Sequence, residues 1–315
     1  MRARMPRVPP PVVALLLSVL LFFVAGVLQP GFLNVDQAIN IVRLAAFLGI
    51  IAAGQTLVII SGGEGIDLSV ANVVTLGAIL TFMVSGGASE RLLPAVAVAL
   101  AVGAVIGLVN GLGIVALSIP PLVMTLGMAG VVKGTILAVT QGDIPGGVPP
   151  LLAKLVTGRL LGLPGVLYLW LLLALLMWGL LERTGYGKRL FAVGVNRSTA
   201  RLSGVNVPLT VVITYTLSGL LAALGGVLLL GFTQRVFLSL GDSYLFPSIA
   251  AVVVGGTVLA GGRGSYVGTM AGALVLTMAE SLLRAMRIGE AYQMIVFGLI
   301  LVALLAVYGR QRDSA

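Results

Sequence analysis

The sequence predicts an all-α membrane protein that crosses the bilayer about ten times. Hydrophobic residues make up 59% of its 315 residues, whereas Asp, Glu, Lys and Arg together make up only 9%. The mean hydropathy is +1.14. Apolar runs about as long as a transmembrane helix recur along the whole chain. Because most of the surface of such a chain cannot face water, a soluble globular enzyme is excluded.

Ten apolar runs can cover most or all of the hydrocarbon thickness of about 30 Å. In chain order they are residues 12–28, 43–60, 68–84, 92–117, 121–140, 164–181, 209–231, 245–259, 265–283 and 291–308. The eighth run is the shortest and is rich in glycine. The first run follows three arginines, but we interpret it as a retained span because it is longer than a signal-peptide core and lacks a typical cleavage site.

The distribution of charge predicts the orientation of the chain. The sequence holds 19 basic and 10 acidic residues. If the N-terminus is cytoplasmic, an even number of crossings places the C-terminus and residues 182–208 on the cytoplasmic side as well. These inside segments then hold most of the basic residues, including every dense cluster, as the positive-inside rule requires. The net charge of +9 is therefore attributed to orientation and not to nucleic-acid binding.

The composition also limits the chemistry that the chain can perform. It contains no Cys and no His, so disulfides, zinc-thiolate sites and imidazole bases are excluded. We expect no catalytic residues, no metal site and no cofactor. The 43 glycines are about twice the usual share. Many lie four residues apart on one helix face, which predicts close helix packing, with a gating role as the alternative. Such groups are Gly103, Gly107 and Gly111; Gly264, Gly268 and Gly272; and Gly130 with Gly134.

Residues 61–69 form an acidic, glycine-rich break between two apolar runs. A carboxylate at the bilayer centre costs about 2.5–3.5 kcal/mol on insertion scales, so the break must lie at an interface, in a polar cavity or inside the protein. Asp67 can cap the following helix by accepting from the N–H of Ser69 or Val70. Two interpretations stay open: a cap at the membrane surface, or a broken helix that lines a path through the protein.

Residues 182–208 form the longest expected inside loop. Asn196 or Ser198 can begin a helix there, Gly204 can end it and Pro208 prevents its continuation. The result is a helix of about two turns, which is too short to persist in water without support. The loop is either a solvated segment that only sets orientation or, as we favour, an element that docks on a cytoplasmic partner. Arg197 and Arg201 are four residues apart and would present one basic face.

Three blocks of sequence carry motifs. The first is GQTLVIISGG at 54–63 with IDLSV at 66–70; the second joins Asn110 and Gly111 with PP at 120–121 and TLG at 125–127; the third covers 187–207, beginning GKR. GGT at 255–257 and GGRGS at 261–265 form a weaker fourth. Together they resemble the permease subunits of ATP-binding-cassette importers for monosaccharides, of the ribose, xylose and galactose type, over nearly the whole chain.

The resemblance implies a single ten-span permease domain over residues 1–315, with the fold of vitamin B12-type (type II) importers. It implies import of a monosaccharide or related polyol through a bacterial inner membrane. The partners would be a second permease subunit, two cytoplasmic ATPase subunits and an extracytoplasmic sugar-binding protein. Consistent with this division, the sequence holds no G-x-x-x-x-G-K-[ST] phosphate loop, so ATP hydrolysis is expected in a partner.

Two sets of residues become site candidates. In the resemblance, residues 182–208 are the loop that couples to the ATPase, through Gly187, Arg189, Ala192, Gly194, Asn196, Ala200, Leu202 and Gly204. The polar residues expected along the translocation path are Gln55, Asp67, Ser69, Asn72, Asn110 and Thr125. For each of these six, helix capping or an interhelical hydrogen bond is at least as good an interpretation.

The sequence departs from the family pattern at three places. Glu64 and Gly65 are inserted into the first block, Ala71 replaces a glycine, and Thr199 replaces the first alanine of a pair in the third block. The insertion lies where a path-lining role would be assigned. The change to Thr199 is small, so coupling should survive it.

Other transport functions stay open from the sequence. Permeases for branched-chain amino acids are related, but their coupling segment tends to be acidic, whereas residues 195–198 hold no carboxylate here. Nucleosides are a further alternative. A stand-alone secondary transporter would need ionisable groups within its spans, and Lys133 and Glu280 are the candidates for that role.

Overall fold

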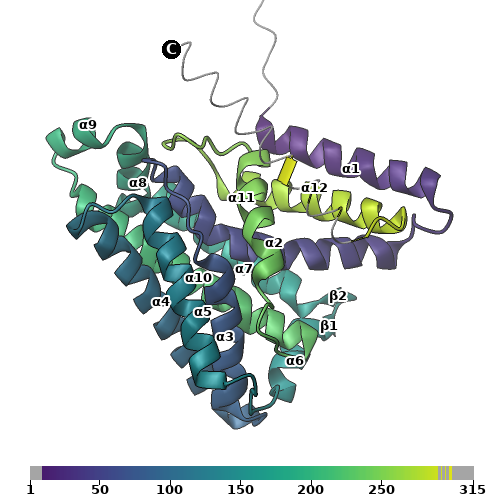
Figure 1. Ribbon diagram of the computed structural model, residues 1–315. Helices are drawn as coiled ribbons and strands as arrows, with labels where there is room; N and C mark the ends of the chain where they lie inside the picture. Colours follow the sequence, from purple (N-terminus) through teal and green to yellow (C-terminus); the bar gives the residue numbers. More distant parts are fainter. Residues whose placement is uncertain (1–8, 290–291, 293–294, 296–297, 300–315) are drawn as a thin grey trace, which may run out of the picture.

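The computed structural model describes residues 9–289, 292, 295, 298 and 299 (Figure 1). The tenth expected span, at 291–308, lies largely outside the described residues. The described chain is mostly helical, with one short antiparallel hairpin of β1 (Arg159–Leu160) and β2 (Leu163–Pro164). The helices are α1 (Pro10–Leu28), α2 (Val35–Ile60), α3 (Val70–Ser85), α4 (Leu92–Ala116), α5 (Pro121–Thr140), α6 (Pro150–Thr157), α7 (Gly165–Trp178), α8 (Gly185–Val195), α9 (Arg197–Leu202), α10 (Val207–Thr233), α11 (Leu245–Val254) and α12 (Tyr266–Ala285).

Each of the first nine expected runs contains an apolar helix. Within the described residues, seven helical stretches are long and apolar enough to cross a membrane. The third and eighth runs are shorter: α3 has 16 residues, and α11 has only 10 after a 3₁₀ turn at Asp242–Tyr244. The sixth run ends in a π-helical turn at Gly179–Arg183, which carries α7 into the loop that follows.

Helices α2 and α10 form the centre of the molecule. In α2, 89% of the most apolar window is buried, because α7, α10, α11 and α12 surround it. Helix α10 packs against α2, α3 and α4. Helix α1 lies at the periphery beside α12, and only 11% of its window is buried (Figure 1). The outward face of α1 is therefore apolar and exposed, as a lipid-facing helix requires.

The predicted glycine stripes explain how the helices approach so closely. A Cβ added at Gly107 would lie 2.1 Å from the carbonyl oxygen of Tyr215, so α4 touches the backbone of α10. Gly272 meets Ala251 of α11 in the same way, at 2.0 Å. These two stripes confirm the packing interpretation. For Gly130 and Gly134, no atom of the described residues lies within 4 Å of an added Cβ, so these two glycines make no close helix contact within that part of the chain.

Two parts of the structure were not expected. The outer connection between α5 and α7 folds into α6 and the β1–β2 hairpin. The 182–208 loop holds two helices and not one, since α8 precedes α9. Helix α8 contains Gly185, Gly187 and Gly194, whose low helix propensity hides it in the sequence. Its N-cap is Thr184, which accepts from the N–H of Gly187 at 3.2 Å.

Candidate functional site

The break at residues 61–69 turns back into the protein after α2 ends. Gly62, Gly63 and Glu64 all adopt left-handed backbone angles, with φ of 66°, 63° and 61°. The side chain of Gln55 then binds both backbone polar groups of Asp67. Its Nε2 donates to the carbonyl oxygen of Asp67 at 2.6 Å, and its Oε1 accepts from the Asp67 N–H at 3.3 Å. Asp67 therefore lies beside α2, about 7 Å along the helix from its end at Ile60.

Asp67 is the centre of a buried polar cluster. Its carboxylate is 1% exposed and accepts from the N–H and hydroxyl of Ser69, at 3.0 and 2.6 Å, and from the hydroxyl of Ser218 in α10, at 2.8 Å. Asn110 of α4 donates to Ser69 Oγ at 3.0 Å. The predicted hydrogen bond from the Ser69 N–H to Asp67 is confirmed, but it is not a helix cap, because α3 begins at Val70 and its N-cap residue is Ser69 itself. The expected place at the membrane surface is not confirmed, because the carboxylate lies among the helices.

Thr125 fastens α5 to the same break. Its hydroxyl lies 3.2 Å from the carbonyl oxygen of Ile66 and 2.9 Å from that of Pro121, and it accepts from the N–H of Leu68 at 3.1 Å. Asn72 is joined to α5 separately, by donation to the carbonyl oxygen of Ala129 at 3.1 Å. Five of the six predicted path residues thus form one connected network, and Asn72 stands beside it. We use the term polar cluster for Gln55, Asp67, Ser69, Asn110, Thr125 and Ser218.

The sequence interpretation missed Ser218. A single serine in an apolar helix usually bonds to its own backbone, so no pattern distinguishes it. Its position next to Gly219, where α4 and α10 touch, is a signal that only packing reveals. Among the described residues, the buried atoms Asn110 Oδ1 and Tyr215 Oη have no hydrogen-bond partner.

The polar cluster is closed in this conformation. All six side chains are almost completely buried. Carboxylate, hydroxyl and amide groups are the types that bind a hydroxyl-rich solute, but here they bind one another and join α2, α4, α5 and α10. They can line a path only in a conformation in which these helices have separated.

The 182–208 loop has a buried and an exposed side. Asn196 begins α9, accepting from the N–H of Thr199 at 3.0 Å, and Gly204 follows its end with φ of 80°. Both features were predicted. Of the coupling candidates, Gly187, Gly194 and Ala200 are buried, Ala192 is partly buried, and Arg189, Asn196, Leu202 and Gly204 are exposed. The side chain of Leu202 is 90% exposed, so the tip of α9 presents an uncovered apolar residue.

The buried side of this loop lies on the break. A Cβ at Gly194 would be 1.9 Å from the carbonyl oxygen of Ile60, and Gly262 donates to that oxygen at 2.9 Å. Arg197 donates from Nη2 to the carbonyl oxygen of Gly62 at 3.1 Å. The single basic face expected for Arg197 and Arg201 is therefore wrong: Arg197 turns inward, whereas Arg201 is exposed.

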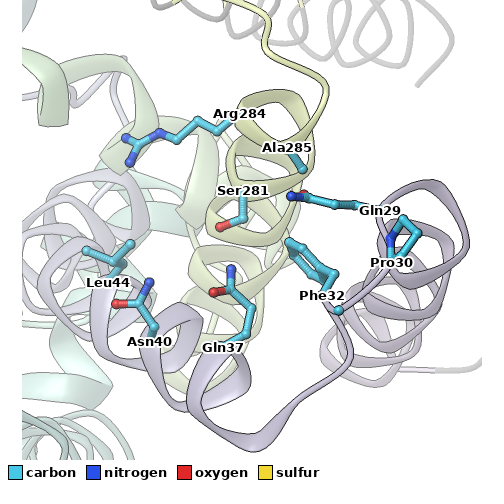
Figure 2. Close-up of a pocket in the computed structure, with 10 residues that line it drawn as sticks. Gln29, Pro30, Phe32, Gln37, Asn40, Leu44, Ser281, Arg284 and Ala285 are labelled. Atoms are coloured by element: carbon cyan, nitrogen blue, oxygen red, sulfur yellow. The ribbon is translucent and has the colours of Figure 1, made fainter.

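A polar pocket of about 370 Å³ lies at the other end of α2 (Figure 2). Gln37 and Asn40 of α2 line it on one side and Ser281 of α12 on another, and the turn after α1 completes it. Arg284 at its edge forms an ion pair with Glu280. This pocket is separate from the polar cluster, since Asn40 lies four turns of α2 away from Gln55.

The two groups considered for ion coupling are both paired. Lys133 lies 3.3 Å from the carboxylate of Asp242, and both side chains are substantially exposed. Glu280 is paired with Arg284 one turn later in α12. Neither is the isolated intramembrane charge that a proton relay requires.

Comparison with known proteins places this fold in a family. Residues 37–305 match the family described as branched-chain amino acid transport system / permease component. The ribose import permease protein RbsC of Escherichia coli K12 is 34% identical over 304 residues, covering 95% of this chain and 94% of the relative. RbsC of Bacillus subtilis 168 is 35% identical over 299 residues, covering 94% and 91%.

A third relative has a different named cargo. The autoinducer 2 import system permease protein LsrC of Shigella flexneri is 33% identical over 302 residues, covering 96% of this chain and 87% of the relative. No solved structure matches the chain. Because the family match spans most of the sequence and these relatives align over nearly their whole length, the chain belongs to the branched-chain amino acid transport system permease family, as a multi-span membrane protein.

Proposed function

We propose that the chain is the permease subunit of an ATP-driven importer for a monosaccharide or a related polyol. The relatives named as ribose import permeases support the class of cargo. One structural observation carries the mechanism: a loop with its own capped helices is seated directly on the break that leads into the polar cluster. A loop that only sets orientation needs neither caps nor a seat.

The proposal includes ten spans, with both chain ends in the cytoplasm and one permease domain over residues 1–315. With this orientation, the end of α2, the 182–208 loop and the turn between α11 and α12 are all cytoplasmic. These three segments contact one another, which supports the arrangement. A fold of the vitamin B12-importer type and a second permease subunit in a bacterial inner membrane complete it.

Coupling to a cytoplasmic ATPase is assigned to the 182–208 loop. Its exposed residues, Arg189, Asn196, Leu202 and Gly204, would face the ATPase. Its buried residues, Gly187, Gly194 and Ala200, together with Ala192, would hold the loop on the membrane helices. Closure of two ATPase subunits on ATP would move the loops and switch the permease pair between outward-open and inward-open states.

The polar cluster is assigned to the translocation path. Opening would exchange the hydrogen bonds among Gln55, Asp67, Ser69, Asn110 and Thr125 for bonds to the passing solute. Asn72 would take part beside them. An extracytoplasmic binding protein would deliver the sugar. The permease supplies a path and no catalysis.

Reconstitution tests this function. The chain is placed in liposomes with the ATPase and binding protein encoded in neighbouring reading frames. Uptake of ribose, xylose, galactose, leucine and uridine is then measured with and without ATP. We expect ATP-dependent uptake of at least one monosaccharide. Uptake restricted to leucine or uridine would reassign the cargo, and uptake driven by a proton gradient without the ATPase would replace the mechanism.

A further inference from the structure

Arg197 is held against the break instead of facing water. Its Nη2 donates to the carbonyl oxygen of Gly62. Its guanidinium also covers Gly63, where an added Cβ would lie 2.4 Å from the guanidinium carbon. The Nε atom is buried and has no partner among the described residues. A planar guanidinium fits this position because it can lie flat on a glycine while one nitrogen reaches a carbonyl.

The contacts around Arg197 join backbone to backbone. An added Cβ at Gly194 would lie 1.9 Å from the carbonyl oxygen of Ile60, and one at Gly261 would lie 2.4 Å from Cα of Gly62. An added Cβ at Gly262 would lie 2.7 Å from the backbone nitrogen of Val195 in the loop. Close-packed backbones cannot yield by side-chain rotation. A displacement of the loop at Gly194 must therefore either move the break or separate from it.

The break is bonded just as firmly at its other end. Five residues after Gly62, Asp67 is fixed to Gln55 of α2 and Ser218 of α10. Ser69 continues the link to Asn110 of α4. The break thus contacts the loop at Gly62 and the polar cluster at Asp67.

We propose that Arg197 is a positioning residue that makes the break follow the 182–208 loop, so that movement of the loop opens the polar cluster. The inference rests on the proposed function, because the ATPase supplies the movement. Arg197 itself does not contact the solute or the ATPase. Because of its hydrogen bond to Gly62, a displacement of the loop also displaces the segment from Gly62 to Asp67.

Matched variants in the full complex test the proposal. Arg197→Ala removes the link, Arg197→Lys keeps the charge but not the flat contact, and Arg201→Ala removes an exposed charge from the same helix without touching the break. Arg197→Ala should still copurify with the ATPase and hydrolyse ATP, while ribose uptake falls about tenfold or more, as for loss of a typical coupling free energy. Ribose uptake by Arg197→Lys should lie between that of Arg197→Ala and that of the unsubstituted complex. Arg201→Ala should retain more uptake per ATP hydrolysed than Arg197→Ala.

A second measurement follows the polar cluster directly. Because the chain contains no Cys, Ser218→Cys introduces a single thiol. Its labelling by a small membrane-permeant reagent should accelerate during ATP turnover, and adding Arg197→Ala should abolish the acceleration while hydrolysis continues. Unchanged uptake and labelling in Arg197→Ala would overturn the proposal, as would equal loss in Arg201→Ala. Loss of ATPase binding in Arg197→Ala would also overturn it, since Arg197 would then be a docking residue. If the unsubstituted complex shows no ATP-dependent uptake, the proposed function fails instead.

Discussion

The contact between α4 and α10 predicts that adding one methyl group will destabilise the permease. In Gly107→Ala, the new Cβ would lie 2.1 Å from the carbonyl oxygen of Tyr215 and 2.9 Å from Cα of Thr216. Both neighbours are backbone atoms, so rotation of a side chain cannot relieve the clash. Ordinary contact distances of about 3.5 Å require the two helices to separate by more than about 1 Å.

The magnitude follows from overpacking. Inserting a methyl group into a well-packed interior costs about 1–3 kcal/mol. We expect the upper part of that range, because separation also loosens the contacts of Gly103 and Gly111 with α10. Gly130→Ala in α5 is the matched control, since no described atom lies within 4 Å of its added Cβ. There Ala should be neutral, or stabilising by up to about 1 kcal/mol through its higher helix propensity.

Reversible unfolding in mixed micelles provides the assay. The purified permease is titrated with sodium dodecyl sulfate, and loss of helix is followed by circular dichroism. The midpoint should fall for Gly107→Ala and stay the same or rise for Gly130→Ala. If Gly107→Ala unfolds at the same midpoint as the unsubstituted protein, α4 and α10 are not in backbone contact and the packing argument is refuted.

Three other changes have expected outcomes. Asp67→Ala leaves three buried donors without their acceptor and should lower the free energy of unfolding by about 2–4 kcal/mol. Asp67→Asn keeps an oxygen and the side-chain volume, so its loss should be less than half of that. The same titration measures both variants. Ala200→Pro should interrupt α9 and uncouple the ATPase while membrane insertion stays intact; wild-type rates of substrate-stimulated hydrolysis and uptake would contradict the docking assignment. Burial raises the pKa of Tyr186 to about 12. The folded state therefore favours the neutral phenol, and its contribution to stability is complete below about pH 10 and is lost as the pH rises toward 12. Tyr186→Phe should reduce the dependence of the unfolding midpoint on pH over that interval. If the midpoint falls as steeply with pH in the variant, another group titrates.

Apolar runs and glycine spacing were enough to predict the nine apolar helices of the described spans and a close helix contact along the Gly103–Gly111 face of α4, but not the partner helix, which is α10. The sequence also placed Gln55, Asp67 and Asn110 in one candidate set, as polar residues of the motif blocks that carry the family resemblance. It could not show that these groups bond one another. That arrangement depends on the break turning back beside α2, which is a matter of tertiary packing.

The errors have physical reasons. Helix α8 escaped notice because its glycines lower helix propensity, and only the structure shows that they are needed for contact with neighbouring backbone. Arg197 was expected to face water because helical spacing alone pairs it with Arg201. The carbonyl of Gly62, a group 135 residues earlier in the chain, decides its direction. A hydrogen bond between residues so far apart in the chain leaves no pattern in the local sequence.

The junction of Ile60, Gly62, Gly194 and Gly262 limits how relatives of this protein can diverge. The three atoms nearest to a Cβ added at Gly62 or at Gly194 are all main-chain atoms, so a larger residue at either position meets no side chain that could become smaller in compensation. We therefore expect relatives to differ there in the number of residues in the connecting turn. Glu64 and Gly65, the two residues that the resemblance marks as an insertion, lie in this turn, and Glu64 is exposed. This junction should therefore tolerate a change in the number of residues of the connecting turn more readily than an increase in side-chain size.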